Sequence, residues 1–126
     1  MAHPIDSVLA GRRVEDLTGG LRLTLRLSGA LEVGIENDFR LTGAAEVEHF
    51  YPALGMRPTG GLPALLGARL TAAHVTPAGA LVLAFDTRHT LTVAPDTAPG
   101  GPEHAWTVTG PTGPLFTALP GGYLTA

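Results

Sequence analysis

The sequence predicts a mainly β protein, an antiparallel small sandwich or partly open barrel with at most one or two short helical turns. Apolar residues alternate with polar ones over several short segments, which is typical of strands with one buried face. The 17 glycines and 11 prolines supply the turns that such a fold needs. The alternating pattern also recurs 60 positions along the chain, first at Leu21, Leu23, Leu25, Leu31 and Val33, then at Leu81, Leu83, Phe85, Leu91 and Val93.

A chain of 126 residues fits one domain, and we expect a single β domain over residues 1–126. The recurrence divides it into two pseudo-repeated meanders, about 9–41 and 65–94, and a closing hairpin at 105–119. We expect about eight strands, at 13–17, 21–27, 31–41, 68–75, 81–85, 90–93, 106–109 and 115–119, and a last short run at 123–125. Segment 65–70 also resembles segment 9–14 at an offset of 56. We therefore expect four extra residues in the second copy, around the turn at 77–79.

The register of the first hairpin follows from its side chains. A two-residue loop would pair Leu25 with Glu32 and bury a charge. A three-residue loop at 28–30 instead pairs like with like and opposite charges with each other: Leu27 with Leu31, Leu25 with Val33, Leu23 with Ile35, Arg26 with Glu32 and Arg22 with Glu36. In the closing hairpin, a five-residue loop at 110–114 pairs Val108 with Phe116 and Trp106 with Ala118.

The segment at 42–61 leaves two alternatives open. Residues 46–51 fit either a strand or a helical turn, because Pro52, Gly55 and Pro58 prevent any long element there. Residues 62–66 fit a single helical turn, with Pro63 early and Gly67 at its end. The segment at 42–61 is also more apolar than a plain loop requires, at Phe50, Tyr51, Leu54 and Met56.

Composition excludes several classes of function. The net charge is −3 and all eight basic residues are Arg, so no global basic field attracts nucleic acid. Without Cys or Lys the chain has no thiolate metal site, Cys nucleophile, Schiff base or P-loop. We expect no signal peptide, no membrane span, no nucleic-acid partner and no cofactor, and we expect a cytoplasmic protein.

The tail carries a pattern of turn and core residues, Trp106-x-Val108-x-Gly110-Pro111-x-Gly113 followed by Pro120-Gly121-Gly122-x-Leu124. Two further runs accompany it, Leu9-x-Gly11-x-x-Val14 and Gly79-x-Leu81-x-Leu83-x-Phe85-Asp86. With these residues the chain resembles a family of small actinobacterial β-rich domains of unknown function. The resemblance implies no catalytic residue. Its pattern expects Gly in the loop after Phe85-Asp86, where this chain has Thr87, Arg88 and His89.

Glu48 and His49, with Tyr51 and Glu46 close by, form the densest titratable cluster of the sequence. In a cleft, Glu48, His49 and Tyr51 could supply a general acid and base. On a connecting segment the same residues would form a solvated face. We retain Glu48, His49 and Tyr51 as catalytic candidates.

The candidates for ligand binding lie in two later loops. Asp86, Arg88 and His89 occupy the second hairpin loop, where a rigid scaffold often carries function. His104 precedes Trp106, which could stack on a ligand at a barrel mouth or lie in the core. The five His residues show none of the HxH, HxxxH or HExxH spacings, and we expect no metal site.

The sequence favours a small non-enzymatic β protein that binds another protein, as an immunity or accessory factor. Some small β proteins of the kind that the tail pattern resembles are similar to immunity partners of polymorphic toxins. The binding surface would be an exposed strand edge or the 42–61 segment, and edge strands also favour a homodimer. The alternative is a small β-barrel that binds an apolar small molecule, as a cyclase or isomerase in a biosynthetic pathway. That alternative requires a cavity of roughly 300 Å³ or more inside the β layers.

Overall fold

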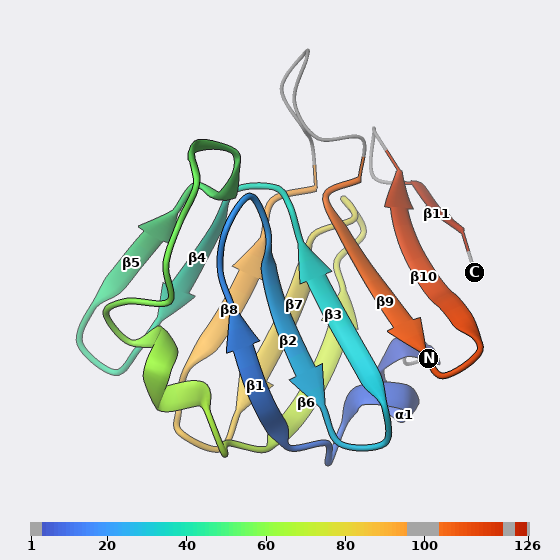
Figure 1. The fold of residues 1–126 in the computed structure, drawn as a ribbon, viewed down its shortest axis with the longest axis horizontal. Coiled ribbons are helices and arrows are strands. Elements are labelled where there is room, and N and C mark those ends of the chain that lie inside the picture. The colour runs from blue at the N-terminus through green and yellow to red at the C-terminus, as the bar shows by residue number, and fades with distance from the viewer. Residues whose placement is uncertain (1–3, 96–103, 120–122, 126) are drawn as a thin grey trace.

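The structure is a computed structural model that describes residues 4–95, 104–119 and 123–125, and it is a two-layer antiparallel sandwich (Figure 1). Sheet I contains six strands in the order β1-β2-β3-β9-β10-β11, and sheet II contains five in the order β5-β4-β8-β7-β6. The predicted mainly β class is therefore confirmed, and the sheets do not close into a barrel. The helical elements are α1 (Pro4–Leu9) and the 3-10 helices η1 (Pro52–Leu54) and η2 (Leu62–Leu65). The strands are β1 (Val14–Thr18), β2 (Leu23–Leu27), β3 (Leu31–Ile35), β4 (Phe39–Thr42), β5 (Val47–Phe50), β6 (Leu70–Val75), β7 (Leu81–Phe85), β8 (Thr90–Val93), β9 (Trp106–Gly110), β10 (Gly113–Leu119) and β11 (Tyr123–Thr125).

The first hairpin has the predicted register. Leu27 pairs with Leu31, Leu25 with Val33 and Leu23 with Ile35, and Arg26 lies opposite Glu32. The strand pairing ends at Leu23, so Arg22 does not pair with Glu36. The Arg22 guanidinium lies instead over Gly34, and its Nε donates to Thr24 Oγ1 at 3.3 Å.

The two repeats lie in different sheets and meet where each one begins. Arg13 of the first repeat forms an antiparallel bridge with Arg69 of the second. The surrounding hydrogen bonds are reciprocal: Val14 N donates to Ala68 O and Leu70 N to Arg12 O, while Gly11 N donates to Leu70 O and Gly67 N to Val14 O. Each bond maps onto its partner at the predicted offset of 56, so the two copies are related by an approximate two-fold axis.

The hairpins of the two repeats differ by 58 positions, two fewer than the sequence predicted. Leu25 pairs with Leu17 and Val33, and its equivalent Leu83 pairs with Ala73 and Leu91. Strand side chains point to the same face at every second residue, so a shift of two positions preserves the apolar pattern. The pattern therefore cannot distinguish an offset of 58 from one of 60. The second copy therefore has two extra residues in its turn at 76–80, not four.

The predicted strand at 31–41 is two strands, and this break defines the topology. Residues 36–38 leave sheet I at the end of β3, and β4 then joins β8 in sheet II. The buried Asn37 holds the crossing: its backbone N donates to Ala105 O and its side-chain Nδ2 to Ala94 O. The alternation continues across the break, and Ile35 and Phe39 both face the core.

The closing hairpin has a counterpart in the first copy. After β1-β2-β3 the chain crosses to add β4-β5 to β8, and after β6-β7-β8 it crosses back to add β9-β10 to β3. Each sheet therefore contains a meander from one repeat and a hairpin from the other. Val108 pairs with Phe116 as predicted, but the strands extend to Gly110 and Gly113 and shorten the predicted 110–114 loop.

The alternating apolar residues of both sheets fill the space between them. Leu25, Val33, Leu83, Leu91 and Trp106 are all 0% exposed, which matches the close packing of protein interiors. Helix α1 packs against β6, where Asp6 Oδ1 accepts a hydrogen bond from Ala73 N. In the described part of the chain, no helix is long and apolar enough to cross a membrane.

Candidate functional site

Strand β5 separates the residues of the predicted catalytic cluster. Residues 47–50 form a strand, so neighbouring side chains point to opposite faces. Glu48 lies opposite the buried Leu41, on the core side, whereas His49 lies opposite the exposed Arg40, on the outer face. Glu48 and His49 therefore do not act on one substrate from one face, while His49 and Tyr51 line the same hollow.

Glu48 has a structural partner. Its Oε1 accepts a hydrogen bond from Gly61 N at 2.8 Å, which fixes the segment between β5 and η2. His89 reaches the same glycine from the β7–β8 loop: a Cβ on Gly61 would lie 2.9 Å from Glu48 Oε1 and 3.4 Å from His89 Nε2. The structure thus brings together Glu48 and His89, which lie 41 positions apart in the sequence. They meet at Gly61, where there is no space for a larger side chain.

The second hairpin loop repeats the conformation of the first. Asp86 Oδ1 accepts a hydrogen bond from Arg69 N, just as Ser28 Oγ accepts one from Arg13 N. Arg88 has φ 68° and its equivalent Ala30 has φ 61°, both in the left-handed region that favours glycine. In the second loop the chain therefore adopts, with Arg at position 88, a backbone conformation that glycine favours.

The remaining two ligand candidates lie beside each other at the start of β9. Trp106 is 0% exposed and its Nε1 donates to Gly79 O at 3.5 Å, so the side chain belongs to the core. His104 is half-buried, and its Nδ1 has no hydrogen-bond partner within the described residues. Across the described ranges no group of three or more His, Asp or Glu side chains is placed to hold a metal ion.

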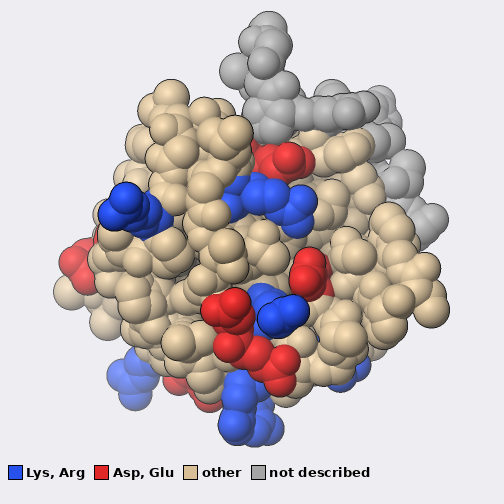
Figure 2. Space-filling view, in the orientation of Figure 1, with Lys and Arg blue, Asp and Glu red and all other residues tan. Residues whose placement is uncertain are grey.

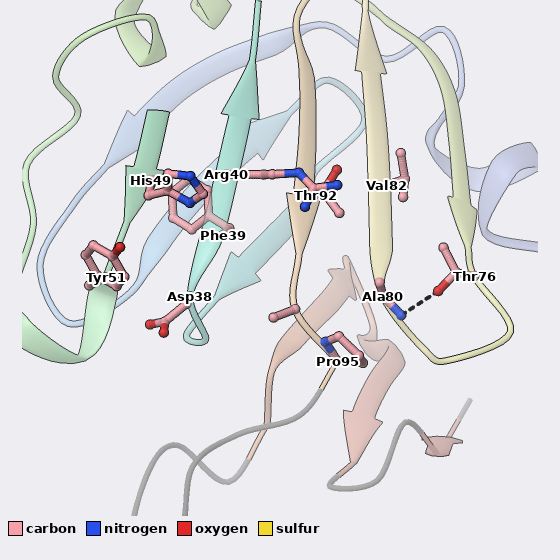
Figure 3. Close-up of a pocket in the computed structure, with 11 residues that line it drawn as sticks. Asp38, Phe39, Arg40, His49, Tyr51, Thr76, Ala80, Val82, Thr92 and Pro95 are labelled. Atoms are coloured by element: carbon pink, nitrogen blue, oxygen red, sulfur yellow. Dashed lines mark hydrogen bonds between the residues drawn. The ribbon is translucent and has the colours of Figure 1, made fainter. Parts of the chain in front are cut away.

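A hollow lies on the outer face of sheet II, not between the sheets. It has a volume of about 560 Å³ and we call it the sheet II groove (Figure 3). Arg40 and His49 line one end, Tyr51 and Asp38 line the side toward β5, and the floor consists of Thr92, Val82, Ala80 and Ala94. Arg40, His49 and Asp38 are exposed, and the floor residues are half-buried.

A second hollow of about 280 Å³ adjoins the groove along β5 and the following segment. His49 and Tyr51 line both hollows, and Leu54 and Met56 line the second alone. Strand β5 and the segment after it carry exposed apolar side chains: Val47 is 52% exposed, Tyr51 49% and Leu54 84%. We call Val47, Tyr51, Leu54 and the outer edge of β5 the β5 edge surface.

Some backbone groups of the β5 edge surface have no partner in the part of the chain that the structure describes. Gly43 N bonds to Glu46 O, and hydrogen-bonded pairs alternate with non-bonded pairs along an antiparallel ladder. The N–H and C=O groups of Val47 and His49 therefore point away from β4. Sheet II ends at β5 in the described part of the chain, so these groups face outward.

Sequence reasoning identified His49 and Tyr51 of the sheet II groove but missed Asp38, Arg40, Thr92 and Val82. The signal was available in principle, because Arg40, Thr92 and Val82 all occupy the polar side of an alternating strand. Their convergence depends on the pairing β5-β4-β8-β7, which joins segments from both repeats and has no local sequence signature.

Comparison with known proteins places the chain in a family without assigning an activity. The model of a "Family of unknown function (DUF6188)" matches residues 5–126. This match confirms the resemblance to a β-rich domain family of unknown function that the sequence pattern indicated. No curated protein matches the chain, and no solved structure does.

Proposed function

The chain belongs to the DUF6188 family, and we propose that it is a protein-binding module that docks its partner on the β5 edge surface. The observation that supports this proposal is the pairing of exposed apolar side chains with an open strand edge. Val47 and Leu54 are more than half exposed beside outward backbone N–H and C=O groups. An added strand would satisfy those groups, and apolar contacts would stabilise it.

The two surfaces that the sequence offered as alternatives form one continuous surface. The strand edge belongs to β5, and the 51–61 segment follows directly and is held to it by the bond between Glu48 and Gly61. Met56 is fixed from the other side, because its N and O both bond to Gly20 beside β1. A docked partner would therefore meet a preformed surface, which lowers the entropic cost of binding.

The proposal is tested by capture experiments in the organism that encodes the chain. Val47→Pro removes the outward N–H without touching the β4 ladder, and Leu54→Asp places a charge in the apolar patch. The control is Leu66→Asp, since Leu66 is 56% exposed at the end of η2. We expect one specific partner to bind wild type and Leu66→Asp and to be lost with Val47→Pro and Leu54→Asp. Equal capture by all four proteins, or no specific partner, contradicts the proposal.

A second copy of the chain is the other occupant that an open edge favours. Light scattering on purified protein from 10 to 200 µM, roughly the range in which weak edge pairing populates a dimer, distinguishes this homodimer from a binder of other proteins. The cytoplasmic location, actinobacterial origin and immunity or accessory role expected from the sequence stay predictions. Cell fractionation and the neighbouring genes test them.

A further inference from the structure

The sheet II groove has an equivalent on sheet I that the chain fills by itself. At the offset of 58 in the hairpins, Ala80 corresponds to Arg22 and Thr92 to Gly34. On sheet I the Arg22 guanidinium lies directly on Gly34, so close that no Cβ fits there, and beside Thr107. On sheet II the position of Arg22 is taken by Ala80, whose methyl group leaves the space open.

The open space borders the guanidinium of Arg40. Arg40 extends from β4 toward Thr92 on the neighbouring strand (Figure 3). Among the described residues the structure records no hydrogen bond or ion pair for the Arg40 side chain. An exposed guanidinium presents five N–H donors in a planar arrangement that matches a carboxylate.

Besides Arg40, the polar groups of the groove are hydroxyl groups, the His49 imidazole and the Asp38 carboxylate, and the rest of its lining is apolar. Val82, Ala80 and Ala94 form the floor, and Tyr51 and His49 form an aromatic wall on the β5 side. Asp38 lies two residues before Arg40 on the same face and carries the opposite charge. It would repel a second negative charge on a ligand. The volume of about 560 Å³ is in the range of sites for single small molecules.

We propose that the sheet II groove is a binding site for a small monocarboxylate with an apolar or aromatic body. The carboxylate pairs with the Arg40 guanidinium and accepts a hydrogen bond from the Thr92 hydroxyl. The body lies on Val82 and Ala80, against Tyr51 and His49. The groove shares Tyr51 with the β5 edge surface, but its ligand contacts the outer face of the sheet and leaves the β5 backbone edge free.

The test titrates four small-molecule probes into the full ¹⁵N-labelled chain. Binding is measured by changes in the chemical shifts of the backbone amides. The probes are 4-phenylbutyrate, its amide, the dianion phenylsuccinate, and an acetylated tripeptide ending in Phe with a free carboxylate. We expect 4-phenylbutyrate to bind with a Kd on the order of 1 mM, with shifts at Arg40, Val82 and Thr92. The amide should bind at least about tenfold more weakly, because it has no negative charge to pair with Arg40. The dianion should also bind at least about tenfold more weakly, because Asp38 repels its second carboxylate.

Three variants locate the site. Arg40→Gln should weaken 4-phenylbutyrate at least about tenfold, and Ala80→Leu should abolish binding by filling the floor. The control Arg26→Gln removes a charge that is also exposed, on sheet I, and should leave the binding of 4-phenylbutyrate unchanged. For each variant, a dispersed spectrum that changes only near the substituted residue excludes unfolding as the cause.

Three results overturn the proposal. The first is equal binding of the acid and its amide, and the second is equal binding by wild type and Arg40→Gln. The third is that the tripeptide binds and 4-phenylbutyrate does not, which would make the groove a site for the C-terminal carboxylate of a peptide or protein. None of these measurements involves a protein partner, so their failure leaves the function of the β5 edge surface to its own test.

Discussion

The hairpins β4-β5 and β9-β10 occupy equivalent positions in opposite sheets, yet their outer edges differ. Strand β10 pairs with β9 on one side and with β11 on the other. Within the described residues, strand β5 pairs only with β4, and the chain then leaves it through the 51–61 segment. Open edges invite association, and proteins commonly protect them. The chain therefore covers the outer edge of the β9-β10 hairpin, whereas among the described residues the outer edge of the β4-β5 hairpin stays uncovered, with exposed Val47 and Leu54 beside it.

The outer faces of the two sheets also differ: side chains of the chain itself cover the face of sheet I, whereas the face of sheet II has an open groove. Figure 2 shows Arg and acidic side chains interleaved over the face that carries β1, β2 and β3. There Arg26 lies opposite Glu32, and Arg22 fills the space over Gly34. The face of sheet II instead has small and hydroxyl side chains around an open groove. The two copies share the arrangement of their strands. They differ in the side chains of their outer faces and in their strand edges, and both proposed binding surfaces lie on sheet II.

The largest expected effect concerns two core residues that the comparison makes equivalent, Trp106 on β9 and Phe39 on β4. Both are buried next to a crossing between the sheets. Trp106→Ala and Phe39→Ala should each lower the free energy of unfolding by about 3–5 kcal/mol in urea titrations, because each leaves a cavity. Tyr51→Ala, at a half-exposed aromatic residue, serves as the control and should cost less than about 1 kcal/mol. A small change in the free energy of unfolding for Trp106→Ala would contradict a core position for Trp106 and favour its role as a ligand-binding residue.

A smaller effect tests whether Asp86 is a turn residue like Ser28. Each accepts a hydrogen bond from the first residue of its repeat's bridge, Arg69 N or Arg13 N. Asp86→Ala and Ser28→Ala should each cost about 1 kcal/mol, the usual value of one such bond. Thermal denaturation measures both. A cost at Ser28 with none at Asp86 would break the equivalence of the two loops and favour a binding role for Asp86.

The smallest effect concerns the left-handed residues of the same loops. Arg88→Gly and Ala30→Gly should each raise the free energy of unfolding by about 0.5–1 kcal/mol, because glycine adopts positive φ without steric cost. Urea titration of both variants against wild type measures the gain, and a loss of stability at either position would contradict the φ values of the structure.

Local pattern predicted the parts of the fold that depend on near neighbours. The hairpin of Leu25 and Val33 followed from apolar alternation and from Arg26 opposite Glu32, and all these pairings are confirmed. The offset of 60 was wrong because alternation repeats every two residues and fixes position only up to a shift of two. The break between Ile35 and Phe39 was missed because the apolar side continues without interruption through the crossing.

The candidate site was predicted less well, for a physical reason. Glu48 and His49 are adjacent in sequence, but the strand directs them to opposite faces. His49 and Arg40 are nine positions apart and lie side by side through the pairing of β4 with β5. The groove also depends on Ala80, which is informative only when compared with Arg22, and that comparison requires the correct offset.

The most direct test of the open edge is hydrogen exchange of backbone amides, residue by residue. The amides of Val47 and His49 point outward from β5, whereas Thr117, equivalent to His49, lies between β9 and β11. We predict near-intrinsic exchange at Val47 and His49 and strong protection at Thr117 in the protein alone. Protection should appear at Val47 and His49 when the partner binds. Strong protection at both residues in the dilute free chain would show that the β5 edge is already paired, and it would contradict the account.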